Sequence, residues 1–158
     1  MRESNSKYRT IAQAGILPMA ARIAIARGNI QLAIGDLKQS IAICKAEGYQ
    51  QAEAQPEAML ADIYRSRGDL VQAETFAAQA TKTSRLSSDR WVLPERPRTL
   101  AQIQSLRGEY IQADRTYQTA RDFVDTDLAN SSSVLEKAAL INASAASFPS
   151  TSHFSRRS

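Results

Sequence analysis

The residues best suited to nucleophilic catalysis are the single cysteine, Cys44, and the single histidine, His153. A Cys–His pair works only when the imidazole is held within hydrogen-bond reach of the thiol. His153 lies in a serine-rich C-terminal segment without helical periodicity, whereas Cys44 stands between Ile43 and Lys45 in an expected helix. We therefore interpret Cys44 as a small packing residue and predict that the chain is not an enzyme.

Carboxylates gather near the middle of the C-terminal half, and paired acids can hold a divalent cation or act as acid and base. A calcium loop would place its ligands at regular spacing, and this pattern is missing. One cysteine also excludes a multi-cysteine zinc site within the chain. We predict a solvated acidic face with no metal and no cofactor, formed by Glu109, Asp114, Asp122, Asp125 and Asp127.

Basic side chains surround the only tryptophan, Trp91. Cations interleaved with an aromatic ring can bind single-stranded nucleic acid by charge and stacking. The net charge of +4 is nevertheless mild for a nucleic-acid-binding protein. We favour an interpretation in which Trp91 fills a joint between helices, and nucleic-acid binding remains a third hypothesis. The cations are Lys82, Arg85, Arg90, Arg96 and Arg98.

The elements that position these residues are delimited by a three-residue segment that recurs every forty residues. Glycine suits the left-handed position just after a helix, and Asn or Asp is a preferred N-cap of the next one. Each segment therefore predicts a helix end followed at once by a helix start, with Glu109 the weakest cap. The three copies are Arg27-Gly28-Asn29, Arg67-Gly68-Asp69 and Arg107-Gly108-Glu109.

Small and apolar residues around these segments keep the same phase. Small residues on both sides of a tight turn allow two helices to approach closely, so each unit is predicted to be an antiparallel helical hairpin. Proline near the start of each first helix fits this scheme, because the first turn has no amide bond to lose. The registered positions include Ala21, Ala61 and Ala101, then Ala33, Ala73 and Ala113, and the prolines are Pro18, Pro56 and Pro97.

The pattern resembles the tetratricopeptide repeat. In the second unit it reads Ala61-x-Ile63-Tyr64, Gly68-Asp69-Leu70, Ala73 and Ala80, whereas the first unit has Ala24 at the position of Tyr64. The usual repeat has about 34 residues, and the forty-residue period here is similar to longer-helix variants of bacterial regulators. The resemblance covers about residues 14 to 146. It implies an all-α fold, a right-handed α-solenoid of three antiparallel helical hairpins plus a C-terminal capping helix.

The expected domain organisation follows from this register. An N-terminal extension or short helix precedes the repeats, a half repeat ends them, and a Ser/Arg-rich tail is expected to be disordered. The ranges are 1–13 for the extension, 14–53, 54–93 and 94–133 for the units, 134–146 for the half repeat, and 147–158 for the tail.

Carried over by register, the resemblance implies a concave groove lined by the first helix of each hairpin. Methionine suits adaptable apolar contacts, and arginine grips carboxylates bidentately, so the groove is expected to bind an acidic peptide or helix. The lysines and asparagines with which related proteins bind chaperone C-termini are not matched. The candidate groove residues are Met19, Arg22, Met59, Asp62, Arg65, Arg98, Gln102 and Asn142.

The favoured function is thus a scaffold for protein–protein interaction. The alternative is a regulatory repeat arm detached from a larger signalling protein, such as a caspase-like protease, a kinase or a transcription regulator. The N-terminal residues lack the apolar core of a signal peptide, and no apolar run is long enough to span a bilayer. A reducing, cytoplasmic location is expected, with no membrane partner.

Overall fold

The computed structural model describes residues 2–86, 95–130 and 134–147, and within these ranges every regular element is a helix. The predicted all-α class is therefore confirmed for this part of the chain. The elements are α1 (Arg2–Ala26), α2 (Ile30–Glu47), the short 3₁₀ helix η1 (Gln50–Ala52), α3 (Ala54–Ser66), α4 (Leu70–Ser84), α5 (Glu95–Leu106), α6 (Tyr110–Asn130) and α7 (Val134–Ser147).

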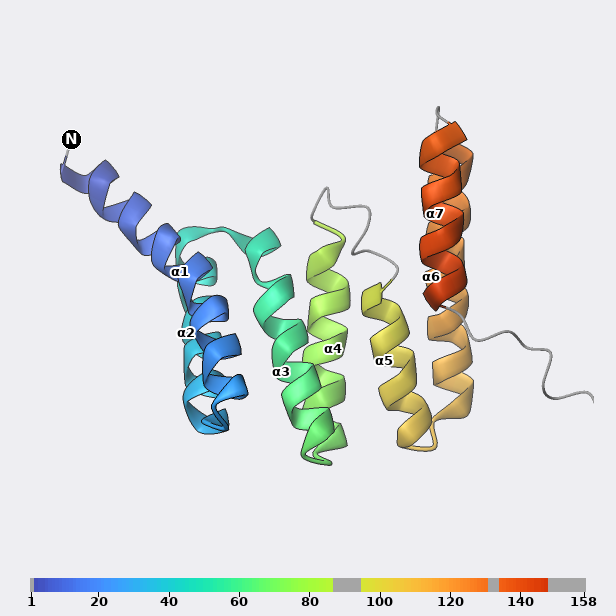
Figure 1. Ribbon diagram of the computed structural model, residues 1–158, viewed down its shortest axis with the longest axis horizontal. Helices are drawn as coiled ribbons and strands as arrows, with labels where there is room; N and C mark the ends of the chain where they lie inside the picture. Colours follow the sequence, from blue (N-terminus) through green and yellow to red (C-terminus); the bar gives the residue numbers. More distant parts are fainter. Residues whose placement is uncertain (1, 87–94, 131–133, 148–158) are drawn as a thin grey trace, which may run out of the picture.

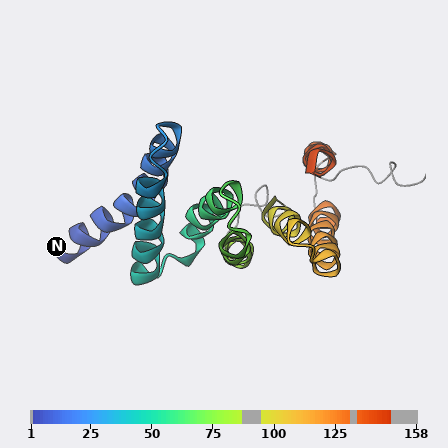
Figure 2. The ribbon, with the colours of Figure 1, turned by 90° about the horizontal axis from the view of Figure 1, so that it is seen from below.

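The helices follow one another along the long axis of the molecule in chain order (Figures 1 and 2). Helix α1 packs against α2, α3 against α4, and α5 against α6, and each of these pairs is joined by a short turn. Contacts of α2 with α3 and of α4 with α5 connect one pair to the next, and α7 packs on α6. Nearly all contacts are therefore made between helices that are neighbours in the chain, as expected for repeated units.

The turns inside the helix pairs share one backbone hydrogen-bond pattern. At the first turn the amide of Gly28 donates to the carbonyl of Ile25 at 2.9 Å, and the amide of Asn29 donates to that of Ala24 at 2.8 Å. These two bonds define a Schellman motif, which needs a left-handed residue after the helix. The prediction of such a residue is confirmed at all three turns, because φ is 78°, 78° and 81° at Gly28, Gly68 and Gly108.

The residues that follow these glycines behave differently from one another. The Asp69 carboxylate accepts a hydrogen bond from the amide of Gln72 at 3.2 Å, which confirms its prediction as an N-cap. Asn29 also occupies the predicted N-cap position, that of α2, but the expected hydrogen bond from its side chain to the helix is not made. Glu109 instead pairs with Arg107 at 3.0 Å, since its longer side chain reaches back across the turn.

Alanines at equivalent positions let the paired helices approach closely. Ala21, Ala61 and Ala101 are fully buried on the first helices, and Ala33, Ala73 and Ala113 are buried on the second. Larger apolar side chains fill the space between one pair and the next. One buried cluster joins α1, α2 and α3 through Leu37, Leu60 and Ile63, and a second joins α3, α4 and α5 through Leu100 and Ile103.

One contact inside the pairs changes its chemistry between repeats. In the second pair the rings of Tyr64 and Phe76 stack with centroids 5.6 Å apart. Forty residues later the same two positions hold Gln104 and Thr116, and the Thr116 hydroxyl donates to Gln104 Oε1 at 2.8 Å. The amide group of Gln104 also donates to Glu74 at 3.2 Å, so this buried glutamine is satisfied from both neighbouring helices.

Helix α1 runs without interruption through Pro18, so the prediction that Pro18 lies near a helix start is wrong. Proline has no amide hydrogen, and the carbonyl of Ala14, four residues earlier, therefore loses its helical partner. The Ser40 hydroxyl on α2 donates to that carbonyl at 2.7 Å and replaces the lost bond. Figure 1 shows the N-terminal part of α1 inclined to the remainder, as a proline inside a helix would cause.

The other predicted boundaries agree more closely with the structure. Pro56 and Pro97 are the third residues of α3 and α5, and Gly48 ends α2 in a left-handed conformation. Residues 2–13, predicted as an extension or short helix, form the first part of α1. The expected half repeat is helical as α7. No helix in the described ranges is both long and apolar enough to cross a membrane. Ser147, the first residue of the predicted tail, is the last residue of α7. The predictions for Trp91, Arg90, His153 and the remainder of the tail lie outside the described residues.

Candidate functional site

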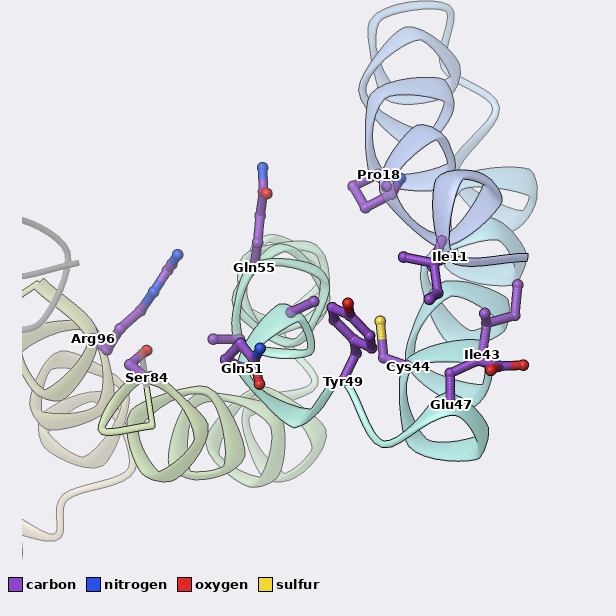
Figure 3. Close-up of a pocket in the computed structure, with 14 residues that line it drawn as sticks. Ile11, Pro18, Ile43, Cys44, Glu47, Tyr49, Gln51, Gln55, Ser84 and Arg96 are labelled. Carbon is purple, nitrogen blue, oxygen red and sulfur yellow. The ribbon is translucent and has the colours of Figure 1, made fainter. Parts of the chain in front are cut away.

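A cavity of about 560 Å³ lies where α1, α2, η1 and α3 meet. Ser84 at the end of α4 and Arg96 at the start of α5 complete its far side, so all three helix pairs contribute to one hollow. Figure 3 shows Ile11 and Pro18 on one side and Ser84 and Arg96 on the other. We call this hollow the seam cavity. Its volume is within the range of pockets that bind small ligands or groups of peptide side chains.

The walls of the seam cavity come from equivalent positions of the first two repeats. Four of the lining residues have a counterpart forty positions further along the chain that also lines the cavity. The cavity therefore follows from the forty-residue repeat. These matched pairs are Ile11 with Gln51, Ala14 with Ala54, Gly15 with Gln55, and Cys44 with Ser84. The walls are largely apolar, and Glu47 and Arg96 supply charges of opposite sign.

Two buried carboxyl groups, Glu53 and Glu57, lie at the start of α3. Burial raises the pKa of Glu53, and the nearby Lys45 ammonium, 3.9 Å away, opposes that shift. Burial likewise raises the pKa of Glu57, while a hydrogen bond with the Thr83 side chain opposes it. Among the described residues, Glu53 Oε1 and Glu57 Oε2 have no hydrogen-bond partner. Burial of an oxygen without a partner disfavours the charged form of a carboxyl group, which is the direction of both pKa shifts.

Burial and the same two acids both raise the pKa of the Cys44 thiol. Burial raises the pKa of the Cys44 thiol, the negative charge of Glu53 raises it further, and a hydrogen bond with Ser40 opposes these effects. A reactive cysteine requires a lowered pKa and an electropositive environment, because only the thiolate is a good nucleophile. Cys44 is thus a protonated wall residue of the seam cavity, in agreement with its interpretation as a packing residue.

The eight predicted groove residues lie on the first helices and on α7, and none of them lines the seam cavity. The forty-residue period aligns Arg22 with Asp62 and Gln102, so the three predicted arginines stand at different heights along their helices. Arg65 pairs with Asp62 at 3.0 Å, and Arg98 pairs with Glu95 at 3.0 Å, each within one helix. The expected proximity of arginine to carboxylate is therefore present at Arg65 and Arg98.

The two methionines and the asparagine among the predicted groove residues have different surroundings. Met59 is half-buried against the cluster formed by α1, α2 and α3. Met19 is exposed on α1. Asn142 is exposed on α7, and the main contacts of this helix are with α6. Of these three residues, only Met59 packs against a buried cluster, and Asn142 lies on α7, a different helix from the other seven predicted groove residues.

The expectations for metal and nucleic acid involve other surfaces. No group of three or more His, Cys, Asp or Glu side chains in the described ranges is placed to hold a metal ion. In the basic stretch, the Arg85 guanidinium lies over the ring of Phe123, 5.3 Å from its centroid. This cation–π contact stabilises the fold and occupies one of the cations that a nucleic-acid surface would use.

Residues of the seam cavity that sequence reasoning missed include Gly15, Tyr49 and Gln55. The signal that could have found Gly15 and Gln55 is their forty-residue separation. Tyr49 carries no such signal, because the residue forty positions further along the chain is Asp89, which differs from it in chemistry. Comparisons of the chain with models of protein families, with curated proteins and with solved structures found no match. The resemblance to tetratricopeptide repeats therefore rests on the residues quoted above.

Proposed function

We propose that this chain is a scaffold for protein–protein interaction. In this proposal the helix pairs stack as three hairpins of a right-handed α-solenoid, α7 caps the stack, and a partner peptide or helix binds along the first helices. No catalytic step is involved, and no cofactor is required. The observation that carries the proposal is the seam cavity, because equivalent residues of successive repeats line it and all three pairs contribute to it.

The chemistry of the cavity suggests the character of the partner. Its walls from α1 and α3 are mainly apolar and include Pro18, Ala14 and Ala54, which suits one or two apolar side chains. Arg96 at the far side would attract a carboxylate. Beyond the cavity, Arg65 is partly exposed beside Asp62 and adds a second cation on the same set of helices. A peptide that combines apolar residues with Asp or Glu therefore fits best.

A library of random twelve-residue peptides, panned against the full chain, tests this proposal. We expect enriched peptides that contain acidic and apolar residues. Gly15→Phe would fill the seam cavity, since a Cβ at Gly15 meets no atom within 4 Å. This variant and Arg65→Glu should each weaken binding at least tenfold, which corresponds to about 1.4 kcal/mol. Raising salt should weaken the wild type more than Arg65→Glu.

The matched control is Val71→Asp, because Val71 is exposed on the second helix α4. This change should leave peptide binding intact. Peptides that bind Gly15→Phe and Arg65→Glu as tightly as the wild type would refute the proposal. If charge reversal at Arg85 alone removed binding, the basic stretch would be the binding surface.

A further inference from the structure

Helix α1 has apolar residues on two opposite sides. One side, with Ala14, Pro18 and Ala21, is buried against α2. The opposite side holds Ile16, Met19 and Ile23, which are 63 %, 65 % and 55 % exposed. The spacing of three and four residues places these three side chains in one stripe along the helix. We call this stripe the outer face of α1.

The repeat register shows what covers the same positions elsewhere. Ile23 corresponds to Ile63 on α3 and to Ile103 on α5, which are 5 % and 0 % exposed. Ile63 belongs to the buried cluster that α3 forms with α2, and Ile103 belongs to the one that α5 forms with α4. In both cases the covering element is the second helix of the preceding pair. The outer face of α1 therefore corresponds to the faces of α3 and α5 that pack against the second helix of the preceding pair.

A polar contact accompanies the apolar one where α4 meets α5. Glu74 on α4 accepts a hydrogen bond from Gln104 and pairs with the Arg107 guanidinium. Arg107 corresponds by register to Arg27, which follows α1 and is exposed. A helix placed on the outer face of α1 as α4 is placed on α5 would bring its glutamate to Arg27. A helix bound to the outer face of α1 would thus meet the positive charge of Arg27 as well as the apolar stripe.

We propose that the outer face of α1 is a docking site for an amphipathic helix of the α4 type, supplied by a partner protein. Such a helix presents small apolar residues at the positions of Ala73 and Ala77 and an acid at the position of Glu74. A second copy of this chain is a poorer occupant, because its own second helices α2, α4 and α6 already pack on α3, α5 and α7. This surface shares no residue with the seam cavity, because Ile16, Met19 and Ile23 do not line that cavity.

A labelled peptide with the sequence of residues 69–86, titrated with the full chain, provides the test by fluorescence anisotropy. We expect saturable binding that Ile23→Asp weakens at least tenfold. Ile111→Asp is the matched control, because Ile111 is an exposed isoleucine on α6 and should not matter. Arg27→Glu should also weaken binding, and a peptide carrying Glu74→Arg should restore it. A scrambled peptide of equal composition should not bind.

A second measurement covers the case in which the free peptide is too weakly helical to bind, since isolated helices of this length are marginal in water. The same residues are joined to the N-terminus of the full chain through a flexible Gly/Ser linker, which raises their effective concentration. We expect a higher Tm than for the chain joined to the scrambled segment, and loss of this gain in Ile23→Asp. An equal Tm for the two fusion proteins, or peptide binding that Ile23→Asp does not weaken, would overturn the proposal.

The remaining outcomes are also decisive. A dimer of the wild-type chain that Ile23→Asp dissociates in sedimentation, together with no peptide binding, would assign the face to a second copy instead. The variants Gly15→Phe and Arg65→Glu should leave binding of the α4-type peptide unchanged. Failure of the seam-cavity proposal would therefore not affect this one, and the reverse also holds.

Discussion

The hydrogen bond between Ser40 and the carbonyl of Ala14 should make an unusually large contribution for a single serine. Pro18 cannot donate to this carbonyl, so the Ser40 hydroxyl is its replacement donor, at 2.7 Å. Ser40 is 1 % and Ala14 is 6 % exposed, so water has little access to this carbonyl when the hydroxyl is removed. Leaving a buried acceptor without a partner costs about 1–3 kcal/mol. We expect Ser40→Ala to lower the free energy of unfolding by this amount.

The control is Ser84→Ala, which removes a hydroxyl of similar burial. The Ser84 hydroxyl donates to the carbonyl of Ala80 at 2.6 Å. That carbonyl is four residues earlier in α4 and can also accept the helical bond from the Ser84 amide. Its loss therefore leaves no unsatisfied acceptor, and we expect a cost below about 0.5 kcal/mol. Urea unfolding followed by far-ultraviolet circular dichroism measures both variants.

A double-mutant cycle with Pro18→Ala tests the cause directly. Alanine at this position restores an amide that can donate to Ala14, so Ser40→Ala should cost about 1 kcal/mol less in this background. An equal cost of Ser40→Ala in the two backgrounds would refute the reasoning, as would equal effects of Ser40→Ala and Ser84→Ala. In either case the serine would act through packing alone.

Three further predictions concern the same framework. Burial raises the pKa of Glu57 in the folded state above the ordinary carboxyl pKa of about 4.3. Above this ordinary pKa, folding is therefore accompanied by proton uptake, and the free energy of unfolding falls as the pH rises. Glu57→Gln should therefore raise the Tm at neutral pH and lose this gain below about pH 4, as measured by thermal melts. Ala73→Leu should cost about 1–3 kcal/mol through overpacking, whereas Leu at the exposed Ala78 should be tolerated; equal midpoints in urea would contradict the register. Gly15→Ala should stabilise α1 by about 0.5–1 kcal/mol, but Gly28→Ala should destabilise, because φ is 78° there; calorimetry that ranks them in the opposite order would disprove this.

Several features of this protein could be predicted from the sequence because they are local. A helix end marked by glycine depends only on a few neighbouring residues, so the turns at Gly28, Gly68 and Gly108 were predictable without any partner helix. The forty-residue period likewise identified the small residues between paired helices, such as Ala33 and Ala73, which are fully buried. The predictions of the turns and of the buried alanines were strengthened by repetition, because the same residue types recur at equivalent positions of each unit.

Features that depend on a neighbouring helix required the tertiary structure. Pro18 suggested a helix start, and only the hydroxyl of Ser40, which bonds the Ala14 carbonyl 26 residues earlier in the chain, explains why α1 continues through the proline. The burial of Glu53 and Glu57 could not be predicted from the sequence either, because an acidic residue in the first turn of a helix is normally an exposed charge that stabilises the helix. Met19 and Met59 occupy equivalent positions, yet one is exposed and the other packs in the core.

The sequence by itself thus determined the helix boundaries at the turns, the repeat period and the small residues of each helix pair, since short-range sterics and periodicity decide them. The tertiary structure decided which polar groups are buried, where the seam cavity lies and which face of α1 stays uncovered. These properties depend on what an adjacent element places against a side chain. Identical register positions acquire different environments when one repeat has a preceding helix and another, such as that of Ile23, has none among the described residues.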